Sequence, residues 1–113
     1  MKISMTYNPA CGTARNVLAL LRERGIEPTI IEYLKTPLTK DAIAALVKQM
    51  GVPVRDVVRT KEVLYSELKL ESAGDDQLLA AMAKHPVLLN RPIVTTPKGV
   101  KLCRPSETVE ELL

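Results

Sequence analysis

The sequence has no phenylalanine and no tryptophan, and its aromatic residues are three tyrosines. A chain of 113 residues is long enough to form one domain with a core of its own. Apolar residues make up 46% of the chain, so that core must be built from aliphatic side chains. Together with 26% charged residues this is ordinary globular composition, which argues against disorder.

Long hydrophobic runs are missing as well. The apolar stretches span only a few residues, far below the roughly 20 that a membrane-spanning helix needs, and the first residues contain no signal peptide. We therefore expect a cytoplasmic protein without a membrane partner, whose thiols stay reduced. The net charge of +3 arises from interleaved acids and bases without a Lys/Arg run, so no nucleic-acid partner is expected.

Two hydrophobic periodicities alternate along the chain. Period-two alternation predicts strands, and apolar residues at i, i+3 and i+4 predict helices. In order, these patterns predict a strand at 3–7, a helix at 14–24, a strand at 29–33, a helix at 39–50, short helices between 53 and 70, a helix at 75–84, strands at 93–96 and 100–103, and a final helix from 105. The expected ends are a cap at Thr39, a cap at Asp75 or Asp76, and stops at Gly25 and Gly51.

This order defines the expected fold class. The β-α-β start requires a parallel strand pair with a right-handed crossover, whereas the later hairpin adds antiparallel strands. The prediction is an α/β, thioredoxin-like (glutaredoxin-like) fold with a mixed four-stranded sheet flanked by helices. We expect residues 1–113 to form a single domain, with a helical insert at about 39–86 between the β-α-β and β-β-α halves.

Cys11 is placed where the first strand has ended and the first helix begins. A helix N-terminus presents unpaired N–H groups and about half a positive charge, and both lower a thiol pKa. The backbone N–H groups of Gly12 and Thr13 would cradle an oxyanion there, and Gly12 has no side chain in the way. Cys11 is therefore the candidate nucleophile, although most free cysteines are simply buried small side chains.

The residues that follow Cys11 exclude several related chemistries. A dithiol motif needs a second cysteine three residues on, where the chain has Ala14. A Cys-x5-Arg phosphatase loop would need arginine where Val17 stands. With two distant cysteines and one histidine, no metal site is expected. Cys103 lies beside Arg104 in a predicted strand, so if Arg104 faces the nucleophile, Cys103 faces away and is structural.

Four blocks of sequence resemble the glutathione- and glutaredoxin-dependent arsenate reductase family (ArsC type). They cover nearly the whole chain in the family's order. The Asn-Arg-Pro-Ile-Val and Cys-Arg-Pro-Ser-Glu sequences in the last two make the resemblance strong. The blocks are Asn8–Arg15, Glu27–Ile31, His85–Val94 and Leu102–Glu107.

The resemblance implies an oxidoreductase that reduces arsenate to arsenite through Cys11. It implies glutathione as co-substrate and glutaredoxin as protein partner, with no bound cofactor. Three arginines hold the arsenic oxyanion in this family, and they correspond to Arg59, Arg91 and Arg104. Such guanidinium groups can each fork two donors onto one oxyanion. The family's proline before the third strand corresponds to Pro92, and its peptide bond is expected to be cis.

One position departs from the family pattern. The best-known members have histidine before the Asn-Pro pair, whereas this chain has Tyr7 before Asn8. A phenol with a pKa of about 10 stays neutral and can only donate a hydrogen bond, so Tyr7 adds no positive charge. This favours one alternative, a glutathione-linked thiol oxidoreductase of the same fold with another substrate. A second alternative is a non-catalytic regulator that binds RNA polymerase.

Overall fold

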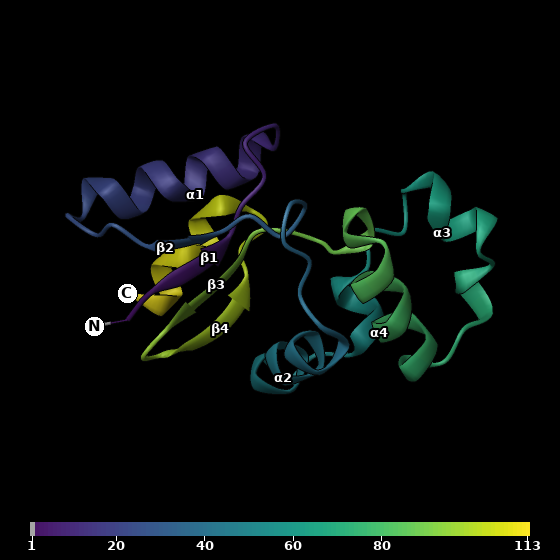
Figure 1. Cartoon of the computed structure of the whole chain (residues 1–113). Helices are drawn as coiled ribbons and strands as arrows, with labels where there is room; N and C mark the ends of the chain where they lie inside the picture. Colours follow the sequence, from purple (N-terminus) through teal and green to yellow (C-terminus); the bar gives the residue numbers. More distant parts are fainter. Residues whose placement is uncertain (1) are drawn as a thin grey trace. The chain divides into compact units, whose positions relative to one another are not determined.

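A mixed four-stranded sheet forms the frame of the structure, a computed structural model that describes residues 2–113 (Figure 1). The strands lie in the order β2-β1-β3-β4. β1 pairs in parallel with β2, whereas the β1–β3 and β3–β4 pairs are antiparallel. Their bounds are Ser4–Thr6 for β1, Thr29–Ile31 for β2, Ile93–Thr96 for β3 and Gly99–Leu102 for β4. The predicted mixed sheet is confirmed.

One face of this sheet carries the core of the first unit. Met5 of β1 lies opposite Val94 of β3, and both side chains are fully buried. Helix α1, Gly12–Glu23, and the 3₁₀ helix η4, Ser106–Leu112, contact each other on this face. Their contributions are aliphatic, as the composition requires: Ala14, Val17, Leu18 and Leu21 from α1, and Val109 and Leu112 from η4.

The end of α1 follows from the glycine after it. Gly25 adopts φ +73°, a left-handed conformation that glycine takes without steric cost. Its N–H donates to the carbonyl oxygen of Arg22, and the N–H of Ile26 donates to that of Leu21. These two bonds are a Schellman motif, so the predicted stop at Gly25 is confirmed.

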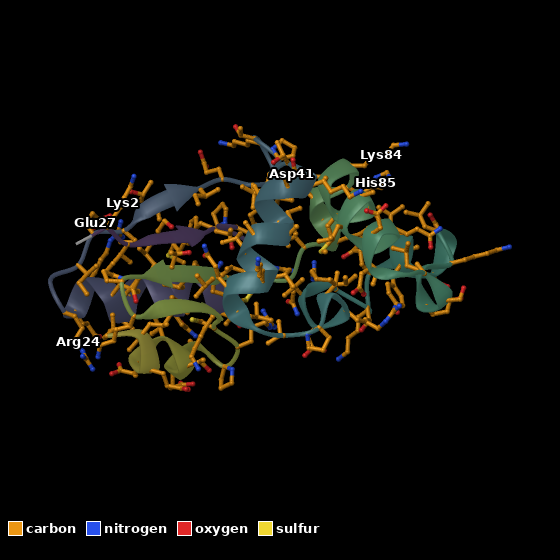
Figure 2. The ribbon with its side chains drawn as sticks, turned by 90° about the horizontal axis from the view of Figure 1, so that it is seen from below. Lys2, Arg24, Glu27, Asp41, Lys84 and His85 are labelled. Atoms are coloured by element: carbon orange, nitrogen blue, oxygen red, sulfur yellow. The ribbon has the colours of Figure 1, made fainter. Side chains whose placement is uncertain are left out.

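The second unit, Pro37–Asn90, is helical, and the first consists of the remaining segments up to Thr36 and from Arg91. Its elements are α2 (Lys40–Met50), η1 (Val54–Val57), α3 (Val63–Glu67), η2 (Leu70–Ser72), α4 (Asp75–Lys84) and η3 (Pro86–Leu88). α4 contacts α2, η1 and η3, and it buries Leu78 and Met82 among them. Figure 2 places Lys84 and His85 together where α4 ends.

Two helix starts in this unit test the predicted caps. Thr39 caps α2 as expected, because its Oγ1 accepts the N–H of Ala42 at 3.1 Å. The cap predicted at Asp75 or Asp76 is wrong, since α4 begins one residue earlier with Gly74 as its N-cap. The side chain of Gln77 reaches back from the first turn and accepts the N–H of Gly74 at 3.1 Å. Both aspartates instead lie in the first turn, where negative charge is favourable.

One boundary near the C-terminus also differs from prediction. β4 ends at Leu102, so Cys103 lies just after the strand and not inside it. The N–H of Cys103 donates to the carbonyl oxygen of Pro92 at 2.9 Å, which holds this position against the start of β3. The final helix begins near Pro105 as predicted, at Ser106, and it is a 3₁₀ helix.

Candidate functional site

Cys11 is the N-cap residue of α1, with the extended conformation (φ −91°, ψ 116°) expected of that position. A tight turn delivers it there. The N–H of Cys11 donates to the carbonyl oxygen of Asn8 at 2.9 Å, and Asn8 Oδ1 accepts the N–H of Ala10 at 3.0 Å. The thiol is buried, with 6% of the residue exposed. The turn thus presents a sheltered sulfur at the start of a helix.

Two of the three predicted arginines act on this sulfur. Arg104 Nη1 donates to Cys11 Sγ at 3.8 Å, within the range of a bond to sulfur, and also to the carbonyl oxygen of Arg91 at 3.1 Å. Arg91 lies at the start of the segment that leads into β3, and its guanidinium also acts on the thiol by charge and hydrogen bonding. The structure therefore brings Cys11, Arg91 and Arg104 together from three separate parts of the chain.

The charge state of Cys11 follows from opposing effects. Burial is the largest single influence and acts to raise the pKa of the thiol. The N–H of Ala14 in the first turn of α1, the charge and hydrogen bond of Arg91, and the hydrogen bond of Arg104 together outweigh it. The side chain of Cys11 does not cap α1 with a hydrogen bond of ordinary geometry. The N–H of Ala14 nevertheless favours the negatively charged thiolate. The pKa of Cys11 therefore lies below its ordinary value.

The first helical residues leave room beside the sulfur. Gly12 and Thr13 are the first two residues of α1, whose N–H groups have no acceptor within the helix. A Cβ added at Gly12 would meet only Arg15 Nη2, at 3.8 Å, which is an ordinary contact. The folded chain itself therefore does not need glycine at this position. The predicted cradle for an oxyanion at Gly12 and Thr13 stays a prediction.

Cys103 differs from Cys11 in the direction in which its surroundings shift the thiol pKa. It is fully buried, and burial raises its pKa to about 12. Its Sγ lies 3.7 Å from the carbonyl oxygen of Lys101, the acceptor of a weak hydrogen bond. Neither cysteine is in a disulfide. A thiol that stays protonated at neutral pH is a poor nucleophile, which favours a structural role for Cys103.

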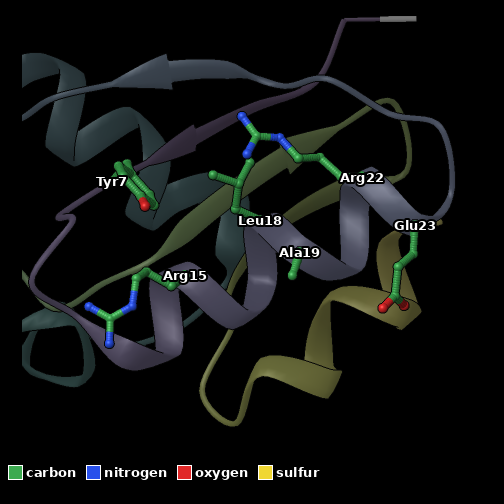
Figure 3. Close-up of a pocket in the computed structure, with 6 residues that line it drawn as sticks. All are labelled: Tyr7, Arg15, Leu18, Ala19, Arg22 and Glu23. Carbon is green, nitrogen blue, oxygen red and sulfur yellow. The ribbon is translucent and has the colours of Figure 1, made fainter.

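Tyr7 is not bonded to the thiol. No hydrogen bond joins its side chain to Cys11 within residues 2–113, and its backbone N–H donates to the carbonyl oxygen of Ile31. The ring instead lines a groove of about 570 Å³ along the outer side of α1 (Figure 3). Arg15 and Glu23 lie toward opposite ends of that groove, with Leu18 between them.

Arg59 belongs to the second unit, where its Nη1 donates to Glu62 Oε2 at 3.2 Å. Its backbone N–H donates to the carbonyl oxygen of Leu88 at 2.8 Å. The carboxylate of Glu62 is thus paired, and the Glu62 side chain is 26% exposed. The role of Arg59 as a third oxyanion ligand stays a prediction.

The structure adds two residues that sequence reasoning missed. Thr6 is 2% exposed, and its Oγ1 accepts the N–H of Ile93 at 2.8 Å, directly after Pro92. The Arg91–Pro92 peptide bond is cis, as expected, and so is Arg104–Pro105. Arg15 Nη1 donates to the carbonyl oxygen of Pro9 at 2.7 Å and holds the turn before Cys11. Thr6 could have been identified from the sequence, because it is a polar residue in a strand expected to be buried. No feature of the sequence pointed to the role of Arg15.

Two further features are absent from the described part of the chain. Residues 2–113 contain no group of three or more His, Cys, Asp and Glu side chains placed to hold a metal ion. No helix among them combines the length and the apolar character needed to cross a membrane.

A four-stranded mixed sheet with one cysteine at the start of its first helix defines a thioredoxin-like protein. The ArsC family model matches residues 6–112. The arsenate reductase of Escherichia coli (strain K12) is 50% identical over 113 residues, covering 98% of this chain and 80% of the relative. That of Rhizobium meliloti (strain 1021) is 47% identical, covering 100% and 82%.

Solved structures agree with this result. An arsenate reductase from Vibrio cholerae superposes with a TM-score of 0.96 at 42% identity, covering 100% of this chain and 98% of that one. The chain belongs to the ArsC family.

Proposed function

We propose that this chain is an arsenate reductase, an oxidoreductase that converts arsenate to arsenite through Cys11. One observation carries the proposal: the Arg104 guanidinium donates to the thiol of Cys11 at the start of α1. A thiolate beside fixed cations suits an anionic electrophile, because the cations both stabilise the nucleophile and attract the substrate. The similarity of the whole chain to arsenate reductases supports arsenate as that electrophile.

The reaction begins with attack of the Cys11 thiolate on arsenic(V), which forms a sulfur–arsenic bond and releases hydroxide or water. Arg91 and Arg104 stabilise the charge on the arsenic oxygens during this step. Arg59 is proposed as the third ligand of the oxyanion, and the N–H groups of Gly12 and Thr13 as further donors. Guanidinium groups suit this task because each can bind two oxygens of a tetrahedral anion.

Electrons must then come from outside the chain. The position three residues after Cys11 is Ala14, and Cys103 is buried with its pKa raised to about 12. Glutathione is the proposed second thiol, and it displaces another oxygen from the cysteine-bound arsenic. A glutaredoxin thiolate then attacks the glutathione sulfur and forms a disulfide with it. The bond between that sulfur and arsenic breaks, and its electron pair stays on arsenic, so oxidation of the two thiols reduces arsenic(V) to arsenic(III). Hydrolysis of the remaining sulfur–arsenic bond releases arsenite and restores Cys11.

The test is a steady-state assay of arsenite formation from arsenate, glutathione and glutaredoxin. We expect sustained turnover with all three present and loss of turnover when either thiol source is omitted. No arsenite above background with the complete mixture would overturn the proposal. Reduction of a glutathione mixed disulfide in place of arsenate would instead support the thiol oxidoreductase alternative, which Tyr7 favours.

A further inference from the structure

The segment of residues 60–73 in the second unit lacks an apolar anchor of its own over most of its length. Helix α3 contains no buried residue, and Val63 is 66% exposed. Leu68, which follows the helix, is 42% exposed, and Lys69 has a positive φ of 54°. Leu70 is the first residue of the segment to be buried, at 5% exposed. Hydrophobic burial alone therefore does not explain the conformation of α3.

Arg55, on η1, supplies the missing attachment through three short hydrogen bonds. Its Nη1 donates to the phenol oxygen of Tyr65 at 2.6 Å and to the carbonyl oxygen of Leu70 at 2.9 Å. Its Nη2 donates to the carbonyl oxygen of Ala73 at 2.7 Å. No carboxylate within residues 2–113 forms an ion pair with this guanidinium. All three of these bonds thus go to the segment that follows Arg59.

The same segment orients the side chain of Arg59. The backbone at this point is fixed separately, because Arg59 donates to Leu88 and the neighbouring Val58 forms a β-bridge with Leu89. The guanidinium is held by Glu62, the residue directly before α3. Glu62 in turn accepts the N–H of Tyr65 at its carbonyl oxygen, 3.0 Å away. The position of Glu62 therefore depends on where α3 is held.

We propose that Arg55 is a positioning residue for Arg59: its bonds to Tyr65, Leu70 and Ala73 fix α3, and thereby Glu62, which orients the Arg59 guanidinium. The proposal rests on the proposed role of Arg59 in binding arsenate. Glu62 engages only Nη1 of Arg59, so an orienting carboxylate and an oxyanion can share one guanidinium. Lysine cannot replace Arg55, because a single ammonium does not reproduce a planar fork directed at three acceptors.

The test measures KM for arsenate and kcat in Arg55→Lys, Tyr65→Phe and Arg59→Ala, each alone, and in the Arg55→Lys/Arg59→Ala double variant. We expect Arg55→Lys to raise KM several-fold with a smaller change in kcat, and Tyr65→Phe to do the same more weakly. In the Arg59→Ala background Arg55→Lys should add nothing, because residues that act as one unit are not additive. Arg22→Lys is the matched control, since Arg22 also forms a forked bond, to Glu27, in the other unit.

The outcomes separate three failures. The Arg55 proposal alone would be overturned if Arg55→Lys raised KM by the same factor in the wild-type and Arg59→Ala backgrounds. It would also be overturned if KM were unchanged in both Arg55→Lys and Tyr65→Phe. An unchanged KM in Arg59→Ala would remove Arg59 from the site and this inference with it. No arsenate turnover by the wild-type protein would overturn the proposed function itself. Tyr65→Phe deletes one oxygen, so it keeps the test decisive if Arg55→Lys does not fold.

Discussion

Nη1 of Arg104 donates to Cys11 Sγ although the two residues are 93 positions apart in the chain. The same nitrogen also donates to the carbonyl oxygen of Arg91. That second bond fixes the guanidinium to the segment leading into β3, so its charge faces the thiol before any oxyanion binds. A preorganised cation of this kind is effective because it needs no rearrangement during the reaction.

The first prediction concerns the activation of the thiol by Arg104. Removing the guanidinium in Arg104→Ala should raise the pKa of Cys11, because one of the groups that lower it is lost. The rate of Cys11 alkylation by iodoacetamide, followed against pH by mass spectrometry, should reach its midpoint at higher pH than in the wild type. Arg24→Ala, which removes an exposed arginine paired with Glu110, is the control. An unmoved midpoint in Arg104→Ala would show that this contact does not activate the thiol.

A second prediction concerns oxyanion binding by Arg91. Arsenate should protect Cys11 from alkylation in the wild type, and Arg91→Ala should weaken this protection about 10- to 100-fold, as expected when a charge-assisted hydrogen bond of about 1.5–3 kcal/mol is lost. Arg91→Lys, which keeps the charge without the fork, should fall between the two. The measurement is the arsenate concentration that halves the alkylation rate. Equal concentrations in wild type and Arg91→Ala would remove Arg91 from the site.

A third prediction follows from the buried thiol of Cys103. Its pKa is raised to about 12 in the folded chain, against about 8.5 for an exposed cysteine. A raised pKa contributes stability that is fully present below pH 8.5 and is lost as pH rises toward 12. Between these values, the unfolded state binds fewer protons than the folded state. The free energy of unfolding should therefore fall by about 1.4 kcal/mol per pH unit from this group.

Cys103→Ala provides the check on that slope. Urea unfolding of wild type and Cys103→Ala at several pH values from 8 to 10.5 should show a shallower alkaline decline in the variant. The pKa of Cys11 is lowered, so its own contribution has the opposite sign. Because both proteins retain Cys11, that contribution cancels in the comparison. Parallel declines would mean that Cys103 does not stay protonated in the folded state.

A fourth prediction tests the cap at the start of α2. Thr39→Ala removes the acceptor of the Ala42 N–H and should lower the free energy of unfolding by about 1 kcal/mol. Thr39→Ser retains the hydroxyl and should lose much less. Hydrogen exchange in α2 should become faster in Thr39→Ala alone. Similar losses in both variants would argue that the methyl group, not the cap, stabilises the helix.

The sequence predicted best where one physical signal dominates a segment. Helix α1 follows a single apolar stripe and ends at a glycine with positive φ, so both its face and its end were predictable. The cap at Thr39 needs only one local hydrogen bond. Both features depend on residues that are neighbours in the chain.

The features that could not be predicted depend on distant partners. Helix α3 has no buried face, and its attachment to Arg55 leaves no periodic signal. The end of β4 at Leu102, one residue before the predicted end, is marked by no pattern in the sequence. The contact of Arg104 with Cys11 was predictable only as a family resemblance, because no local rule relates positions so far apart. Sequence pattern therefore located the nucleophile, whereas the structure was needed to find what surrounds it.

The central claim is that Cys11 is the one thiol of this chain that reacts with arsenate. The most direct test compares arsenite formation by Cys11→Ser and Cys103→Ala with that of the wild type, in the presence of arsenate, glutathione and glutaredoxin. The account predicts that Cys11→Ser abolishes turnover, while folded Cys103→Ala retains most of it. Full activity in Cys11→Ser, or equal loss in both variants, would contradict the account.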